Sequence, residues 1–228
     1  MTTSATTTFD LSLTDAVEEA FERAGSEARS GYDLRTARRS LNLLLTSWAN
    51  RGLNLWTVAS DTISLVAGTA TYAVPDQAVD LLEHLIRTGA GTSQNDISMT
   101  RISVSAYAAI PNKNAVGKPL QILVTRGQAG NTVTVWPTPD SSTTYTLAFW
   151  YMRRMYDAGP TGVNTNDVPY RFLPALVAGL AYYIARKIPE GQARLDGLKK
   201  DYEEEWQMAA DEDHDKASVR FVPRIGLV

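Results

Sequence analysis

Residues 168–187 read VPYRFLPALVAGLAYYIARK and include the most strongly apolar part of the chain. Pro174 stands in the first turn of this part, where a helix tolerates proline. Six apolar residues fall at successive helical offsets and form one broad face: Leu173, Leu176, Val177, Leu180, Ala181 and Ile184. The stretch therefore predicts a helix that is well buried in the core.

This apolar stretch does not predict a membrane span. Residues 173–185 are interrupted by Pro174 and Gly179 and fall short of the roughly 20 residues that a bilayer requires. Residues 1–8 are rich in Thr and lack the basic and apolar regions of a secretion signal. We therefore expect a water-soluble protein that is assembled in a cytoplasm and has no membrane partner.

Helices are also expected on both sides of the buried one. After Pro189 a long helix follows, with charged faces and a narrow apolar stripe formed by Leu195, Leu198, Tyr202, Trp206 and Ala209. Near the N-terminus a short helix is expected after Thr14, its N-cap, and Gly25 is expected at its C-terminal end. The apolar residues with helical spacing are Leu13, Val17, Ala20, Phe21 and Ala24. A second helix is expected from about Asp33 to Asn50, with an apolar face formed by Leu34, Ala37, Leu41, Leu44, Leu45 and Trp48.

Between these helical regions, from Asp61 to Met155, the apolar residues repeat with a period of two, which is typical of strands. A β-hairpin is expected to turn at Gly68 and to join residues 63–67 to residues 70–74. Residues 79–88 fit a strand or a helical turn, and residues 103–109 fit a short helix. Further strands are expected at residues 120–125, 132–136 and 144–152.

Helices at both ends with strands between them predict an α+β fold, because each helix has one apolar stripe to bury. The terminal helices should form a bundle into which a mainly antiparallel β-domain is inserted, followed by an extended C-terminal arm. The predicted boundaries are residues 9–58 for the N-terminal helices, 59–156 for the β-domain, 157–168 for a loop, 169–216 for the C-terminal helices and 217–228 for the arm.

The residue types offer little support for catalysis. The chain has no cysteine, which excludes disulfides, thiolate metal sites and cysteine nucleophiles, and it has only two histidines, His84 and His214. His84 is expected to be a half-buried strand residue. No glycine-rich phosphate loop and no zinc-binding helix motif occurs, so no cofactor, metal or catalytic residue is expected.

Two charged groups on the expected helices are candidates for contacts. Arg35, Arg38 and Arg39 lie largely off the apolar face of their helix and are candidates for a subunit interface, although a solvated face is the commoner outcome. The final helix carries an excess of acids, most simply a solvated surface. In a ring around a channel these acids would repel a DNA backbone, and the channel-facing candidates are Glu203, Glu204, Asp211 and Asp213.

The C-terminal residues 218–228 are apolar but too short to form a core of their own, so we expect an arm that needs a partner. Its candidate docking residues are Arg220, Phe221, Val222, Pro223, Arg224 and Ile225.

Four segments in succession carry a resemblance to a known family: ARRSLNLLLTSWANRGLNLWTV at residues 37–58, LVAGTATYAVP at residues 65–75, VPYRFLPALVAGLAYYIARK at residues 168–187 and DYEEEWQMAADED at residues 201–213. In order and spacing they resemble the head-to-tail adaptor (connector) family of short-tailed phages. The resemblance implies a structural virion protein at the head-to-tail interface, in a ring of twelve copies around the DNA channel. It also implies attachment to the phage portal protein above and to a tail nozzle or tail-tube protein below, without enzymatic activity. The β-region is longer than the family requires.

Two alternatives remain open. A phage enzyme acting on the cell wall would need two carboxylates across a cleft, such as Asp80 and Glu83, but nothing in their spacing selects them. A DNA-binding module would place Arg35, Arg38 and Arg39 on phosphates, but the net charge of -3 gives no general basic footprint.

Overall fold

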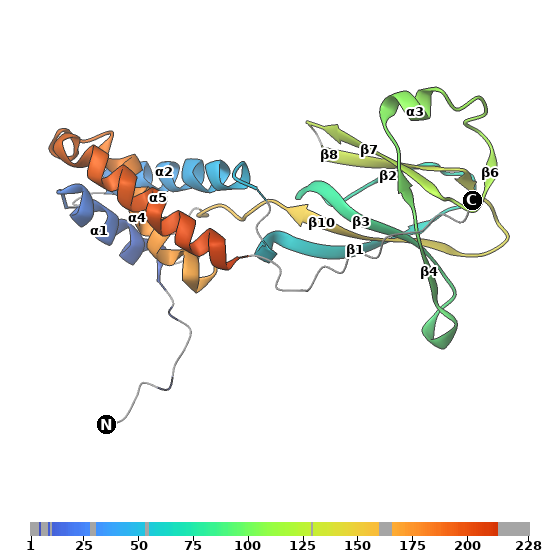
Figure 1. The fold of residues 1–228 in the computed structure, drawn as a ribbon, viewed down its shortest axis with the longest axis horizontal. Coiled ribbons are helices and arrows are strands. Elements are labelled where there is room, and N and C mark those ends of the chain that lie inside the picture. The colour runs from blue at the N-terminus through green and yellow to red at the C-terminus, as the bar shows by residue number, and fades with distance from the viewer. Residues whose placement is uncertain are drawn as a thin grey trace, which may run out of the picture. The chain divides into compact units, whose positions relative to one another are not determined.

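A computed structural model describes residues 5, 9, 11–27, 31–52, 55–128, 130–159 and 166–213. The chain divides into two compact units (Figure 1). The helical unit comprises residues 1–56 and 156–228, and the β unit comprises residues 57–155. Because helices from both ends of the chain flank an antiparallel sheet region, the predicted α+β class is confirmed. No described helix has the length and apolar character that crossing a membrane would demand.

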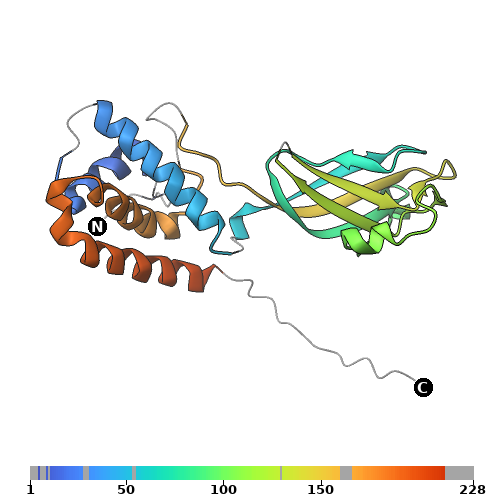
Figure 2. The same cartoon turned by 90° about the horizontal axis from the view of Figure 1, so that it is seen from above.

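Helix α4 (Leu173–Ala185) is the centre of the helical unit. It contacts α1 (Leu13–Ala24), α2 (Gly31–Ala49) and α5 (Leu195–Glu212), as Figure 2 shows from a second direction. Gly179 lets α2 and α5 approach α4, because an added Cβ would lie 2.8 Å from the Tyr202 ring and 3.0 Å from Leu44. The predicted buried helix is therefore the element on which the other three pack.

Aromatic side chains from both ends of the chain fill the space beside α4. The Trp48 ring lies 4.6 Å from Trp206 and 5.9 Å from Phe172, measured between ring centroids. The buried Trp48 Nε1 donates a hydrogen bond of 2.9 Å to the Tyr202 hydroxyl. This cluster joins α2 to α5 across 154 residues of sequence.

Two details of the predicted helices are wrong. The N-cap of α1 is Ser12, whose hydroxyl accepts a hydrogen bond of 3.1 Å from the Asp15 amide, and Thr14 lies inside the helix. The helix begins one residue before Thr14 because Leu13 is itself buried in the core. Leu34 is 41% exposed and so does not belong to the buried face of α2, whereas Ser40 is buried in addition to the predicted face. Gly25 ends α1 with a φ of 88°, as predicted.

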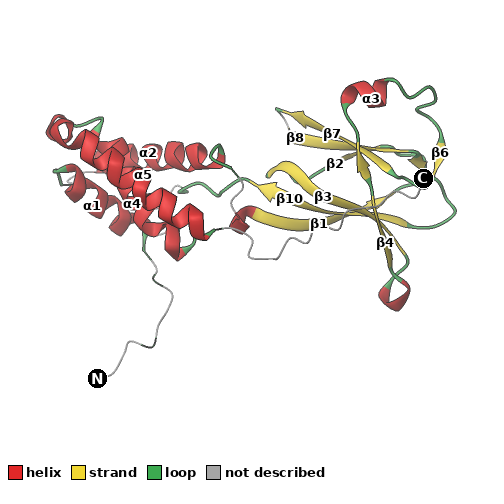
Figure 3. Cartoon of the chain, in the orientation of Figure 1, coloured by secondary structure: helices red, strands yellow, loops and turns green. Residues whose placement is uncertain are grey.

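The β unit consists of two four-stranded sheets and a short strand pair (Figure 3). One sheet has the order β1 (Val58–Leu65), β10 (Tyr145–Arg153), β3 (Ala78–Thr88) and β4 (Asn95–Ser98). The other has the order β2 (Thr71–Ala73), β8 (Gly130–Trp136), β7 (Gln121–Gly127) and β5 (Thr100–Arg101), while β6 (Val116–Gly117) pairs with β9 (Thr138–Pro139). Both sheets contribute to one apolar core, which includes Leu147 and Phe149 from β10 and Val133 and Val135 from β8.

The three strands predicted in the second half of this region are confirmed as β7, β8 and β10, and residues 79–88 form a strand, β3. The short helix is confirmed as α3 (Val104–Ala108), with the Ser103 hydroxyl accepting a hydrogen bond from the Ala106 amide. Of the predicted loop, residues 160–165 lie outside the described residues, as does the whole C-terminal arm.

The predicted hairpin through Gly68 is wrong, because its two strands belong to different sheets. All eight residues of β1 pair with β10, from Val58↔Met152 to Leu65↔Tyr145, whereas β2 pairs with β8. The Tyr72 hydroxyl stabilises the connection by accepting from the Val66 amide at 2.8 Å and donating to the Thr69 carbonyl at 2.8 Å. A two-residue repeat of apolar residues indicates that a strand has one buried face, but it does not indicate which strand lies beside it.

His84 is buried in β3, where it pairs with Phe149 of β10, and is not half-buried as predicted. It is 8% exposed, and neither ring nitrogen has a hydrogen-bond partner among the described residues. Burial, assisted by the nearby positive charge of Arg101, lowers the pKa of His84 below its ordinary value of 6.5. The folded β unit therefore holds this imidazole in its neutral form.

We expect Trp48→Ala or Leu180→Ala to lower the free energy of unfolding by about 2–5 kcal/mol, because both side chains are fully buried and truncation leaves a cavity. Urea denaturation measures this loss. The matched control is Leu43→Ala on α2, where the side chain is 59% exposed and the change should stay within about 0.5 kcal/mol. Equal midpoints for core and control variants would show that the proposed core is incorrect.

A second prediction concerns the dependence of stability on pH through His84. Because the unfolded chain protonates His84 at a higher pH than the folded chain does, it binds more protons once the pH falls below about 6.5. The contribution of His84 to stability should therefore be constant above that pH, decline as the pH falls through it, and level off below the lowered pKa. Urea unfolding between about pH 5 and pH 8 should show a shallower decline for His84→Leu than for the parent chain. Parallel curves would contradict the assignment.

Candidate functional site

Two carboxylates, Asp80 and Glu83, were candidates for an enzyme acting on the cell wall. Asp80 receives a hydrogen bond of 2.9 Å from Arg101 and a second one from Arg126. Burial alone would raise the pKa of Asp80, but the hydrogen bonds and the positive charges of Arg101 and Arg126 together outweigh burial and lower it. Asp80 is thus held as an anion between two arginines, which is unsuitable for a general acid. Among the described residues, no group of acids and histidines has the arrangement of a metal site.

The three arginines of α2 have different surroundings. Arg35 and Arg39 are exposed, and Arg39 donates a hydrogen bond of 3.3 Å to the Thr36 hydroxyl. Arg38 is half-buried and interacts within the chain. Lys187, whose role the sequence pattern did not indicate, donates a hydrogen bond of 2.6 Å to the Ser40 hydroxyl. Burial, together with the positive charge of the nearby Arg39, lowers the pKa of Lys187.

The acids of α5 are not equivalent. Glu203 forms a bidentate ion pair with Arg51, with distances of 2.8 and 2.9 Å, and the Arg51 guanidinium lies over the rings of Tyr202 and Trp206. Glu204 is exposed and lies 3.6 Å from Lys200. Asp211 is exposed and accepts a hydrogen bond of 2.6 Å from Gln207. Glu204 and Asp211 therefore present charge to solvent, while Glu203 also holds α5 against the end of α2.

Asp213 is a buried structural acid, and this corrects its choice as a channel-facing candidate. Its side chain is 3% exposed, pairs with Arg171, and accepts a hydrogen bond of 3.0 Å from the Leu55 amide. Asp213 thereby fixes the end of α5 to the segment through which the chain leaves the helical unit. Its place in a run of acids made it look solvated, and sequence alone gave no signal of its distant partners.

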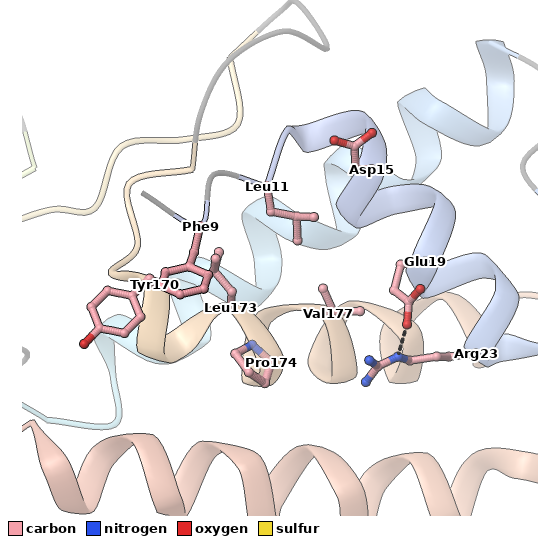
Figure 4. A pocket seen from close by; sticks show the side chains of 9 residues that line it. All are labelled: Phe9, Leu11, Asp15, Glu19, Arg23, Tyr170, Leu173, Pro174 and Val177. Carbon is pink, nitrogen blue, oxygen red and sulfur yellow. Dashed lines mark hydrogen bonds and ion pairs between the residues drawn. The ribbon is translucent and has the colours of Figure 1, made fainter. Parts of the chain in front are cut away.

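An open apolar groove of about 670 Å³ lies between α1 and the N-terminal part of α4 (Figure 4). Leu173, Pro174 and Val177 of α4 form one side. Phe9 and Tyr170 stack at one end, with their ring centroids 5.8 Å apart. Leu11 adds to the apolar lining, and Asp15, Glu19 and Arg23 of α1 line the polar side. The groove was missed because Leu173 and Val177 were assigned entirely to the core.

The β unit has its own exposed surface on the sheet that contains β1 and β10. Trp150 is 41% exposed and pairs with Ser60 of β1 and with Glu83 of β3. It borders a pocket of about 300 Å³ that also involves Arg87, whose guanidinium is paired with Asp96. Aromatic residues such as Trp150 are enriched in protein interfaces relative to the rest of a protein surface.

The candidate docking residues Arg220 to Ile225, like His214, lie outside the described residues.

We expect Asp213→Ala to lower the free energy of unfolding by about 1–3 kcal/mol, because Arg171 and the Leu55 amide both lose their acceptor. The control is Asp211→Ala, two residues earlier on the exposed surface of the same helix. Urea denaturation of the two variants provides the comparison. A loss at Asp213 no larger than at Asp211 would contradict the structural role.

Comparison with known proteins gives one family match. The family model described as SU10 adaptor protein matches residues 11–224, a range that includes every described helix and strand. No curated protein matches the chain. The expected resemblance to a phage adaptor family is confirmed, while the attribution to short-tailed phages stays a prediction. The chain belongs to the SU10 adaptor protein family, whose members are structural phage proteins.

Proposed function

We propose that the chain is a subunit of the ring that joins the phage portal protein to the tail at the head-to-tail interface of the virion. The observation that carries this proposal is the family match over residues 11–224, which includes both units. In this role the protein acts by binding and sealing, and it makes or breaks no bond. Twelve copies are expected from the resemblance to head-to-tail adaptors, with a tail nozzle or tail-tube protein as the second partner.

The properties of the helical unit support this role. The N-terminal and C-terminal parts of this unit are joined by the Trp48–Tyr202 hydrogen bond and by the Arg51–Glu203 ion pair. A closed ring of identical subunits needs two different surfaces that complement each other. The exposed Arg35 and Arg39 of α2 are proposed for one of these surfaces.

The exposed acids of α5 support a channel that does not retain DNA. Glu203, Glu204 and Asp211 are proposed to lie near the DNA backbone, where their like charge would limit adhesion. No specific contact with DNA is needed for this role.

The C-terminal arm is proposed to bind the portal. Phe221, Val222 and Ile225 would enter apolar grooves, Pro223 would favour an extended arm, and Arg220 or Arg224 would pair with acids at the groove edge. The arm has the composition of a segment that needs a partner in order to bury its side chains.

We expect the chain to be captured by a ring of its own phage's portal protein in a stoichiometric complex, and a chain ending at Ala217 to be captured much less. Co-sedimentation and native mass spectrometry measure capture and copy number. The melting temperature of the shortened chain is the control for folding. Undiminished capture would exclude the arm as the portal contact, and absence of capture of the full chain would contradict the adaptor role.

A further inference from the structure

The groove between α1 and α4 has apolar surface that the described residues do not cover. Phe9 is 68% exposed and Tyr170 is 60% exposed, although the two rings stack on each other. They adjoin Leu11, Leu173 and Val177 along the groove (Figure 4). A volume of about 670 Å³ lies within the range of volumes found for ligand-binding clefts. The groove can therefore accept several apolar side chains.

The polar side of the groove has a net negative charge. Glu19 and Arg23 neutralise each other through an ion pair of 2.8 Å. Asp15 is exposed in the first turn of α1, and its backbone amide donates to the N-cap Ser12. A segment that complements this groove would carry apolar side chains and a cation placed to meet Asp15.

The C-terminal part of the chain has this composition. Residues 218–228 read SVRFVPRIGLV, which combines apolar residues with two arginines and contains no acidic side chain. The match concerns both properties of the groove, its apolar lining and the sign of its charge.

The end of α5 lies close enough for this segment to reach the groove. Asp213, the last described residue, forms an ion pair with Arg171, and Arg171 is adjacent in sequence to Tyr170 of the groove. The 15 residues from 214 to 228 can extend up to about 50 Å. The last described residue is therefore near the groove, and the chain that follows it is long enough to lie along the groove.

We propose that, before assembly, the groove between α1 and α4 binds the C-terminal arm of the same chain. Phe221, Val222 and Ile225 fill its apolar part, and Arg220 or Arg224 pairs with Asp15. Tethering raises the effective concentration of the arm at the groove to the order of millimolar, so modest affinity is enough to keep it bound. The arm's later transfer to the portal rests on the proposed function, but its binding to the groove does not.

The consequence is a subunit that covers its own docking segment until a competing site appears. An arm held in the groove cannot take part in unplanned contacts between free subunits. On docking, the arm would then replace its apolar contacts with the groove by apolar contacts with the portal. Because the arm is already ordered, docking costs less conformational entropy.

A peptide of residues 218–228, labelled with a fluorophore, tests the proposal without portal. The chain ending at Ala217 should bind this peptide with one-to-one stoichiometry in fluorescence anisotropy. The full-length chain should bind it at least about tenfold more weakly, because its own arm occupies the groove. Equal affinity for both chains, or no binding to the shortened chain, would overturn the proposal.

Matched variants of the shortened chain locate the site. Tyr170→Ser should weaken binding several-fold, whereas Tyr32→Ser on α2, where the ring is 64% exposed and away from the groove, should have no effect. Asp15→Arg should weaken binding of the parent peptide, and a peptide with Arg220→Glu and Arg224→Glu should recover affinity for that variant. Failure of this charge reversal to recover any binding would show that the arm does not meet Asp15.

Light scattering of the full-length chain separates binding within one chain from exchange between chains. A monomer at all concentrations agrees with the proposal. Association that grows with concentration and disappears on truncation at Ala217 would mean that the groove binds the arm of a neighbouring copy, and would refute binding within the chain.

Discussion

The helical unit depends on a buried hydrogen bond between side chains that lie 154 residues apart in sequence. Trp48 Nε1 donates to the Tyr202 hydroxyl, and burial raises the pKa of Tyr202 to about 12. The hydroxyl therefore stays protonated and neutral in a site that cannot solvate a phenolate. Because the whole β unit is encoded between these two residues, the helical unit can close only after the β unit has been synthesised. The inserted arrangement thus makes the integrity of the helical unit depend on both ends of the chain.

Two charged contacts also hold the helical unit together, one near the surface and one buried. Arg51 pairs with Glu203 near the surface and lies over the rings of Tyr202 and Trp206, so one cation contacts both a carboxylate and the aromatic cluster. Asp213 acts further along α5, in a site where its side chain is almost fully buried. An exposed pair contributes little by itself, whereas loss of one partner of a buried pair leaves an uncompensated charge. Loss of the Asp213 carboxylate should therefore destabilise the helical unit more than loss of the Arg51–Glu203 pair.

The apolar pattern of the sequence predicted where helices and strands form better than it predicted which of them lie side by side. The buried helix at residues 173–185 and the strands at residues 121–127 and 145–153 were predictable, because each buries a face that recurs at its own period. The pairing of β1 with β10 was not, since that contact is set by packing between residues 80 to 94 positions apart and not by either strand alone. The same periodicity placed Arg35 and Arg39 of α2 on the exposed side of the helix. The buried state of Asp213 could not, because it depends on Arg171 and Leu55 from two other segments.

Surface charge limits how identical subunits can meet. Arg35 and Arg39 make part of α2 basic, while Glu204 and Asp211 make part of α5 acidic, so the subunit carries opposite charges on two different helices. Contacts between unlike surfaces are what a closed ring of identical subunits requires. If the acidic surface of α5 met the basic surface of α2 on the next subunit, its charge would be neutralised there and could not also repel DNA. The interface and channel assignments of these charges are therefore competing uses of the same acids, and an acid that faces the channel must be one that no neighbouring arginine reaches.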